Sequence, residues 1–386
     1  MSGNYYLGID TSNYKTSVAV VDDEGNVISD CRKFLEVKKG ERGIRQSEAL
    51  FQHVNNLPGV IKEAVAALTA DNRVNRTEAL NTESETGSFE LKKVKRDFNI
   101  KAVAVSSRPR PLKDSYMPAF LAGVSVGKSV ATAMGIPVYE FSHQEGHVAA
   151  VKRGLRLENP ERFIAFHFSG GTTEAVMVTN PASREGEDAN RNVTTYEIVG
   201  GSRDISYGQL LDRIGVAVGF RFPCGEEMDK IACAEATRGI KIPKIKCKDG
   251  YINLSGQEAH CLRRLKENGD LRPENVNGLI FALFEEITSS MSEITEYLAK
   301  KYDVRDFIYA GGVSSSSFVR KKLKCDGNCN IHFGEPELAT DNAVGTALLG
   351  RERYGAETDR CVTTKLLSVT RDRLSLIGRA SCRERV

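Results

Sequence analysis

The chain contains one structural unit twice, and this repetition limits the folds that it can adopt. In the first copy, an apolar run at residues 5–10 leads through the turn Thr11-Ser12-Asn13 into a β-branched run at 17–21. In the second copy, an apolar run at 163–168 leads through a glycine-containing turn at 169–173 into a run at 175–178. Both patterns predict a β-hairpin with a hydroxyl-rich turn. The sequence therefore favours either two domains or one duplicated architecture.

The two turns have the chemistry of anion-binding loops. Small hydroxyl side chains and free backbone N–H groups can bind a phosphate, and Asp10 can hold its counter-ion. In the second turn, Gly170 and Gly171 allow a phosphate or acyl group to approach the backbone. A hairpin that opens any mixed sheet would have the same pattern, so an ordinary structural hairpin remains the alternative.

Strand and helix signals alternate along the rest of the chain. Apolar residues at helical spacing over 276–298 predict one long helix with a buried stripe. A helical pattern at 47–69 is expected to be interrupted at Pro58. A strand at 307–310, the turn Gly311-Gly312 and a helix from Ser314 would place a helix N-terminus near a nucleotide, although many folds share this pattern. Further strands are predicted at 102–105 and 137–140, with a helix at 117–134.

Two of the six histidines, His143 and His147, lie four residues apart. On a helix this spacing puts both imidazoles on one face, where they can bind one divalent metal. The motif differs from that of zincin peptidases, because Glu145 does not follow the first histidine directly and a helix-weakening Gly146 precedes the second. The alternative is an ordinary helix with two surface histidines. Asp341 is either the N-cap of a later helix or a carboxylate that faces the metal.

Composition indicates an intracellular globular protein. A chain of 386 residues with 40% hydrophobic content can bury two modest cores. No signal peptide or transmembrane run is found, which predicts a cytoplasmic location. Nine cysteines without regular spacing predict reduced thiols, with only a weak metal motif at Cys325 and Cys329. The formal net charge of +3 is small, so contact with nucleic acid would need a local patch or a partner protein.

The last ten residues, 377–386, read IGRASCRERV and look like a translated sequencing adapter. They are therefore left out of the fold prediction. Without their three arginines and one glutamate the formal net charge falls from +3 to about +1.

Seven motifs occur in a fixed order: Gly8-Ile9-Asp10-Thr11-Ser12, His143 to His147, Ser169-Gly170-Gly171, Gly208 with Asp212, Pro223 to Gly225, Ala310-Gly311-Gly312-Val313 and Thr340-Asp341-Asn342. Together they resemble the TsaD-type tRNA threonylcarbamoyladenosine synthases, formerly called O-sialoglycoprotein endopeptidases. The resemblance covers roughly residues 3–352, apart from two polar insertions. Its most specific part is the histidine pair followed by the later Thr-Asp-Asn.

The resemblance implies an α/β fold of the actin/Hsp70/sugar-kinase type. Two ribonuclease-H-like lobes would enclose a central cleft for a nucleotide and a metal. The first lobe is expected at residues 1–140, with an insertion at 71–98, and is completed by 336–355. The second lobe is expected at 141–335, with an insertion at 180–195.

The resemblance also implies a set of site residues. His143, His147 and Asp341 would bind one divalent metal, iron or zinc, and together with Asp10 would form the catalytic group. ATP or threonylcarbamoyl-adenylate would be bound by a larger set: Ser169, Gly170, Gly171, Thr172, Thr173, Asp212, Gly225, Gly311, Gly312 and Ser316. In this family the metal polarises the mixed anhydride, and the exocyclic amine of an adenosine beside the tRNA anticodon attacks its carbonyl. The implied partners are threonylcarbamoyl-AMP, tRNA and accessory proteins of the tRNA modification complex, with no membrane.

Several residues depart from the family pattern within the predicted cleft. Asn13-Tyr14-Lys15 replaces Cys-Asp-Glu, and Arg108-Pro109-Arg110-Pro111 replaces a Gly-Pro-Gly loop. Thr172 replaces a histidine and Ser316 an asparagine, and in the motif at 46–53 only Ala49 and His53 are retained. Three hypotheses follow: a threonylcarbamoyltransferase, a metal- and nucleotide-binding paralogue with another acceptor or a non-catalytic role, and a metallopeptidase, which the missing zincin glutamate disfavours.

Overall fold

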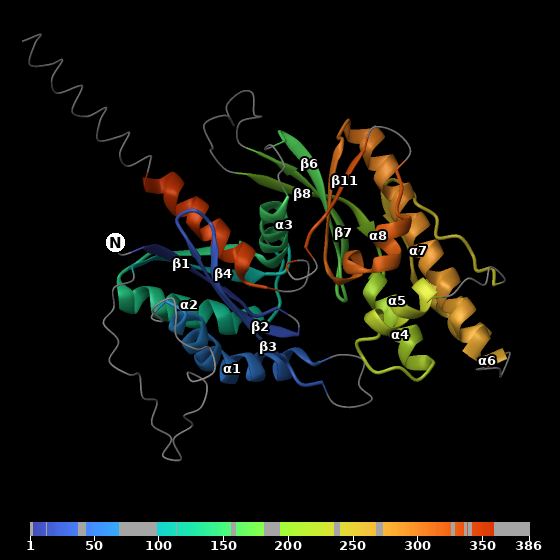
Figure 1. Cartoon of the computed structure of the whole chain (residues 1–386), viewed down its shortest axis with the longest axis horizontal. Helices are drawn as coiled ribbons and strands as arrows, with labels where there is room; N and C mark the ends of the chain where they lie inside the picture. The colour runs from blue at the N-terminus through green and yellow to red at the C-terminus, as the bar shows by residue number, and fades with distance from the viewer. Residues whose placement is uncertain are drawn as a thin grey trace, which may run out of the picture.

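The structure of the protein is a computed structural model, shown in Figure 1. It describes residues 3–12, 14–37, 44–68, 99–112, 114–155, 160–180, 194–234, 240–267, 273–325, 329–335, 338 and 342–358. The predicted insertion at 71–98, most of that at 180–195, the segment 377–386 and Asp341 lie outside the described residues.

A five-stranded sheet forms the N-terminal lobe. Its strand order is β3-β2-β1-β4-β5, in which β2 is antiparallel to β1 and β3, whereas β4 and β5 run parallel to β1. The strands are β1 (Asn4–Asp10), β2 (Lys15–Asp22), β3 (Val27–Phe34), β4 (Asn99–Arg108) and β5 (Val138–Ser142).

A six-stranded sheet in the second lobe repeats this topology. Its order is β11-β10-β6-β7-β8-β9; β6, β7 and β8 form an antiparallel meander, and β10 and β11 run parallel to β6. Without the two-residue β9, the order and directions equal those of the first sheet. The predicted duplication and the expected α/β class with two similar lobes are confirmed. The strands are β6 (Arg162–Phe168), β7 (Thr173–Thr179), β8 (Thr195–Ser202), β9 (Tyr251–Ile252), β10 (Asp306–Ala310) and β11 (Asn330–Phe333).

Helices cover both faces of the first sheet (Figure 1). Leu7 and Ile9 of β1 face one apolar cluster, which includes residues of α1 (Gln46–Ala66) and α2 (Phe120–Met134). Tyr6 faces the opposite cluster, which includes Ala347 of the helical segment 344–358. This alternation along β1 is the period of two that a strand covered on both sides requires.

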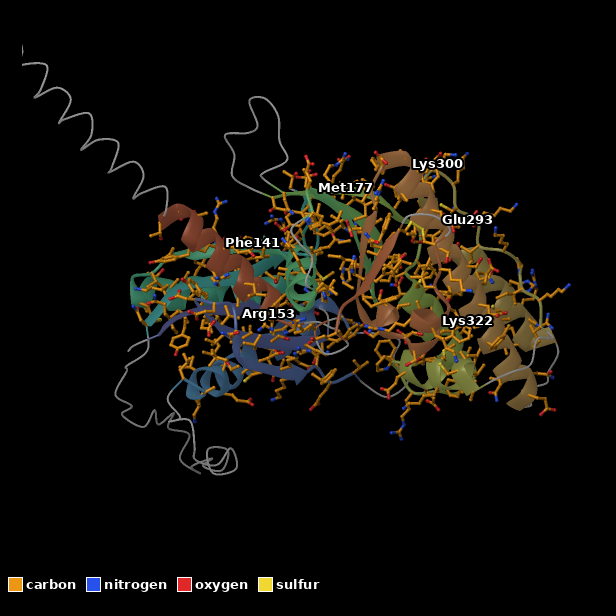
Figure 2. The ribbon with its side chains drawn as sticks, turned by 45° about the horizontal axis from the view of Figure 1, so that its top comes forward. Phe141, Arg153, Met177, Glu293, Lys300 and Lys322 are labelled. Carbon is orange, nitrogen blue, oxygen red and sulfur yellow. A yellow bond between two sulfur atoms is a disulfide. The ribbon has the colours of Figure 1, made fainter. Side chains whose placement is uncertain are left out.

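The second sheet is covered in the same way. Its outer face packs on five α-helices and one short 3₁₀ helix. Its inner face packs on α3 (His143–Gly154), which lies between the lobes. Side chains fill the layers, with Met177 in the sheet and Glu293, Lys300 and Lys322 on the outer helices (Figure 2). The outer elements are α4 (Tyr207–Ala217), α5 (Gly225–Ala234), α6 (Ser255–Glu267), α7 (Pro273–Tyr302), the short 3₁₀ helix η3 (Gly312–Ser315) and α8 (Ser317–Lys322).

Helix α1 continues through Pro58, so the predicted interruption is wrong. Leu57, Val60 and Ala64 on either side of the proline are all buried against the sheet. Packing of this apolar face outweighs the lost backbone hydrogen bond, because tertiary contacts override local propensity.

The structure also bears on the predictions about the cysteine thiols and about membrane-spanning segments. Cys325 and Cys329 form a disulfide, so the prediction of reduced thiols is wrong for this pair. Within the described part of the chain, no helix combines the length and the apolar character needed to cross a bilayer.

The helix-weakening Gly146 has a packing role. Helix α3 packs against the helical segment 344–358, and a Cβ atom at Gly345 would overlap the carbonyl oxygen of Gly146. A Cβ atom at Gly146 would lie 2.9 Å from the Thr346 hydroxyl. The two glycines therefore allow the helix backbones to touch, which offsets their low helix propensity.

Replacing Gly345 by alanine should destabilise the protein, because the added methyl group would force the two helices apart. We expect the free energy of unfolding to fall by about 2 kcal/mol or more. Gly355→Ala in the same helical segment is the control, since a Cβ atom there meets nothing within 4 Å. Urea denaturation should show it unchanged or up to about 1 kcal/mol more stable. Equal stability of the two variants would contradict the close helix contact.

Candidate active site

Helix α3 begins at the first histidine of the predicted motif. The Ser142 side chain accepts a hydrogen bond from the Glu145 backbone N–H, and the Glu145 carboxylate accepts one from the Ser142 N–H at 2.6 Å. This capping box fixes the start of the helix at His143. His143 and His147 consequently lie one turn apart on the same buried face, and Glu145 is used as a cap.

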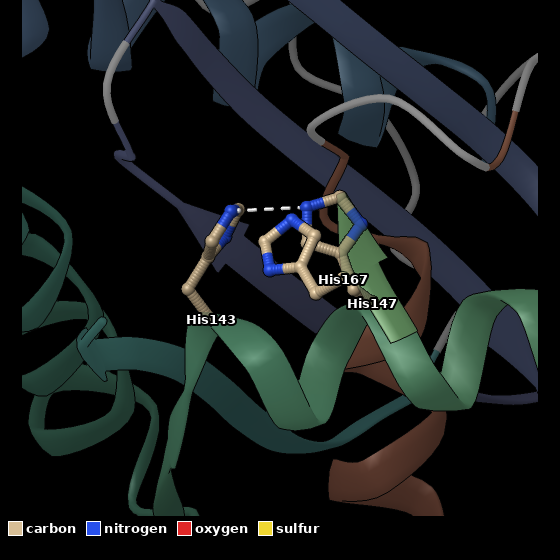
Figure 3. Close-up of side chains that lie close together, drawn as sticks. All are labelled: His143, His147 and His167. Atoms are coloured by element: carbon tan, nitrogen blue, oxygen red, sulfur yellow. Dashed lines mark hydrogen bonds between the residues drawn. The ribbon is translucent and has the colours of Figure 1, made fainter. Parts of the chain in front are cut away.

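A third histidine, His167, completes a cluster that the sequence analysis did not predict (Figure 3). It lies on β6 and points to the same face as Phe163 and Ala165, against which α3 packs. One ligand nitrogen of each of His143, His147 and His167 lies within 4.8 Å of the others, and all three side chains are buried. The Nε2 atoms of His143 and His147 are 3.0 Å apart.

The duplication places His167 in a position equivalent to that of Asp10. Asp10 pairs with Ser17 across the first hairpin, and His167 pairs with Glu174 across the second, with the same separation along the chain. Asp10 and His167 thus occupy matching sites at the ends of the two inner strands. Alignment of the two hairpins by their turns is the sequence signal that would have revealed His167.

Asp10 lies against the other side of His143. Its Oδ2 atom is 2.7 Å from His143 Nδ1 and accepts a hydrogen bond of 2.7 Å from Ser106 Oγ, while Oδ1 accepts one from the Ser12 N–H. Burial raises the pKa of Asp10, but the charge of His143 and these hydrogen bonds outweigh it and hold the pKa below its ordinary value. In the neutral form of His143, the ionised carboxylate would favour the proton on Nδ1 and leave Nε2, which lies beside His147, free to bind a metal.

The cluster fits a divalent metal. Three imidazoles from two rigid elements supply nitrogen donors of the type that zinc and iron accept, and a carboxylate orients one of them. Three protein ligands would leave a coordination position open for substrate. The alternative of two surface histidines is excluded by their burial.

A cavity of about 700 Å³ lies between the lobes and reaches His143. Its lining combines Ser12 and Tyr14 of the first hairpin with Gly170, Gly171 and Thr172 of the second. Asp212 of α4 also lines it. A cavity of this volume suits a ligand of nucleotide size.

The second hairpin turn is held tightly by α4. The Ser169 N–H donates to the Thr172 carbonyl at 2.8 Å, and the Ser206 hydroxyl donates to the Gly170 carbonyl at 2.8 Å. A Cβ atom at Gly208 would lie 2.5 Å from both the Ser169 carbonyl oxygen and Gly170 Cα. The turn therefore has one position relative to the cavity, and Gly208 makes this close approach possible.

The comparison with known families shows the family to which the chain belongs. The family model described as TsaD, tRNA N6-adenosine threonylcarbamoyltransferase, matches residues 90–348, more than half of the chain. The chain belongs to the TsaD family.

Two relatives agree with this assignment, and one solved structure shares the fold. A Dictyoglomus turgidum protein named tRNA N6-adenosine threonylcarbamoyltransferase is 26% identical over 359 residues, which cover 90% of this chain and 93% of that protein. A Staphylococcus saprophyticus protein of the same name is 28% identical over 363 residues, 90% of each chain. The structure of HypF from T. kodakarensis has a TM-score of 0.51 at 13% identity and covers 92% of this chain and 48% of that one. This last similarity concerns the fold alone.

Within this TsaD-family chain, three predicted nucleotide-binding residues make contacts of their own. Gly311 packs its backbone on Phe168, and Gly312 opens η3. The Ser316 hydroxyl caps α8 and donates to the Asp229 carboxylate. None of Gly311, Gly312 and Ser316 is among the described residues that line the cavity.

Of three other predicted residues, Asp212 lines the cavity. Thr173 accepts a hydrogen bond from the Tyr207 N–H at 2.9 Å. Asp212 accepts one from the Cys224 N–H at 2.7 Å, and burial outweighs this bond and raises the pKa of Asp212. Gly225, which follows Cys224 in the chain, is the first residue of α5, and a Cβ atom there would meet nothing within 4 Å.

The loop at 108–111, which departs from the TsaD pattern, joins the two lobes. The Arg110 guanidinium lies 2.5 Å from the Glu174 carboxylate of β7, which also accepts a hydrogen bond of 2.7 Å from the Gln144 side chain. Burial outweighs both contacts and raises the pKa of Glu174. A cationic side chain thus enters a position where the family has a glycine-rich loop.

His53, which the family motif retains, is fully buried on α1 and bonded to Thr16 of β2 at 2.9 Å. Burial lowers the pKa of His53 from 6.5 to about 4, against the opposing field of Asp10. Between these pH values the unfolded chain binds the extra proton and the folded chain does not. His53 therefore contributes stability above pH 6.5 that is lost as the pH falls toward 4.

A His53→Gln variant should be less sensitive to acid, because its amide can bond to Thr16 but does not titrate. Wild type should lose about 3 kcal/mol of unfolding free energy through this one group as the pH falls from 6.5 to 4. Urea denaturation of both proteins across this range measures the difference. Parallel pH profiles would show that folding leaves the pKa of His53 unchanged.

Proposed function

We propose that this chain transfers the threonylcarbamoyl group of threonylcarbamoyl-AMP to the exocyclic amine of the adenosine beside the anticodon in tRNA. Membership of the TsaD family supports the proposal. The structural observation that carries it is the cavity of about 700 Å³, in which the Ser169–Thr172 turn, Asp212 and His143 meet.

Different residues of the chain would bind the adenylate, hold the metal and orient its ligands in such a transfer. The backbone of the Ser169–Thr172 turn faces the cavity and would bind the adenylate, with Asp212 beside it. His143, His147 and His167 would hold iron or zinc at the inner end, and Asp10 would keep His143 oriented. The bound cation would act as a Lewis acid on the carbonyl of the mixed anhydride. Positioning of donor and acceptor would supply most of the rate enhancement.

The same proposal extends to the surroundings of the site. We propose that the lobes divide near residue 140, as the family resemblance implies, and that Asp341 approaches the histidine cluster as a further ligand. We also propose a cytoplasmic location, with accessory proteins that deliver tRNA, because a formal charge of +3 attracts RNA only weakly.

A second candidate function is supported by the cleft substitutions. Tyr14 and Arg110 place an aromatic ring and a cation where the TsaD pattern has an acid and a small loop. A TsaD-like paralogue with the same metal and nucleotide but another acceptor would fit these changes. The peptidase hypothesis is disfavoured, because the one carboxylate of the histidine motif, Glu145, caps α3 and lies 3.6 Å from Arg108.

Complementation separates the two candidates. Cells depleted of their own transferase are supplied with this chain, and their tRNA nucleosides are analysed by mass spectrometry. Recovery of threonylcarbamoyladenosine is expected with wild type and not with a His143→Ala, His147→Ala double variant. If the soluble wild-type chain leaves tRNA unmodified with partner proteins present, the paralogue function is favoured.

A further inference from the structure

Two aromatic rings, one from each lobe, meet beside the cavity. Tyr14 lies between β1 and β2 of the first lobe, and Phe222 lies between α4 and α5 of the second. Their ring centroids are 5.6 Å apart at an interplanar angle of 60°. Both line the cavity that reaches His143, so together they form an aromatic surface on the path to the histidine cluster.

The aromatic residues of the cavity are more exposed than His143. His143 is 7% exposed, Tyr14 and Phe222 are half-buried, and Tyr116, which also lines the cavity, is 68% exposed. Aromatic side chains at an open cavity edge are the feature with which proteins bind unstacked nucleobases, since every base offers a π-face.

Charge contributes little to this part of the cavity. Its two guanidinium groups are both paired, Arg110 with Glu174 at 2.5 Å and Arg213 with Glu258 at 2.8 Å. Asp212 lines the same cavity. Phosphate attraction is therefore a weak source of affinity here, which leaves stacking as the main one.

We propose that Tyr14 and Phe222 stack the acceptor adenine of the RNA and so direct its exocyclic amine toward His143. This inference rests on the proposed function and names the residues that select the acceptor. The TsaD pattern has an acid at the position of Tyr14, and a carboxylate cannot stack on a base. The competing occupant is the adenine of the adenylate. Of the residues that the resemblance assigns to the adenylate, Gly311 and Gly312 are not among the described residues that line this cavity.

The test uses the chain with its accessory proteins and a short RNA stem–loop that carries 2-aminopurine in place of the acceptor adenosine. This base has no amine at C6, so binding is measured without transfer, and its fluorescence falls when it stacks. Wild type should quench the probe, and Tyr14→Ala and Phe222→Ala should each weaken binding about tenfold. Tyr14→Phe should retain wild-type affinity. Phe51→Ala is the matched control, because Phe51 is a 63% exposed ring on α1 that is not among the described cavity residues.

Each other outcome overturns the inference. Absence of RNA binding, binding without quenching, or equal affinities of Tyr14→Ala and Phe51→Ala would exclude stacking on this surface. Displacement of the quenched probe by AMP alone would assign the surface to the base of the adenylate. If the probe is quenched as expected but no group is transferred to an authentic adenosine, the proposed function is refuted. The assignment of Tyr14 and Phe222 as a base-stacking site would still stand.

Discussion

A His167→Ala variant should lose its bound metal almost completely. Wild type is expected to hold about one equivalent of iron or zinc per chain, and the variant less than about a tenth. Removal of His167 leaves only the two imidazoles of α3 from the described cluster. Changes to outer hydrogen-bond partners of a metal ligand already reduce affinity about 10–100-fold, so loss of a ligand should cost more.

Two further variants make this measurement specific. His332→Ala is the control, since His332 lies on β11 beside Asp306 at 3.2 Å and outside the cluster; its metal content should equal that of wild type. Asp10→Asn should fall between the two, because the amide cannot hold His143 as the carboxylate does. Elemental analysis gives the stoichiometry, and a chelator should lower the melting temperature only of proteins that hold metal. Unchanged metal in His167→Ala would remove this histidine from the site.

The second large effect is expected at Gly208. A methyl group there would push the Ser169–Gly171 turn away from α4, since it would lie 2.5 Å from the Ser169 carbonyl oxygen. A displacement of about 1 Å at a substrate-binding turn can lower a rate about 100-fold. We therefore expect Gly208→Ala to lose about 100-fold in transfer rate while it retains its metal, because the histidine cluster lies on other elements.

Gly355→Ala is again the matched control, and its transfer rate should equal that of wild type. Single-turnover assays with saturating threonylcarbamoyl-AMP separate the chemical step from donor binding. A Gly208→Ala protein with normal rate and normal metal content would show that the turn does not position the reacting group.

Much of the fold could be predicted because its signals are local. The two hydroxyl-rich hairpins and the helical stripe of α7 are visible within short windows of sequence, and the doubled sheet follows from them. The break at Pro58 was predicted from propensity alone, and burial of the neighbouring apolar residues overrode it. The low helix propensity of Gly146 in α3 is explained by its contact with Gly345, which the sequence around Gly146 does not contain.

The site was predicted in part. His143 and His147 form a local motif, whereas His167 joins them through strand register and helix packing, which single windows do not contain. Asp10 was predicted both to hold the counter-ion of a phosphate and to join the histidines in the catalytic group, and the structure places it against His143. The contact of Tyr14 with Phe222 depends on the closure of one lobe over the other, so it had no signal in the sequence.

The most direct measurement is transfer by the purified, metal-loaded protein. Threonylcarbamoyl-AMP and unmodified tRNA are supplied with accessory proteins, and the nucleosides are quantified by mass spectrometry. Threonylcarbamoyladenosine should form with wild type and His332→Ala, and should be reduced to background in His167→Ala. Absence of the modified nucleoside with metal-loaded wild type, or its undiminished formation by His167→Ala, would contradict a transferase whose centre is the three-histidine cluster.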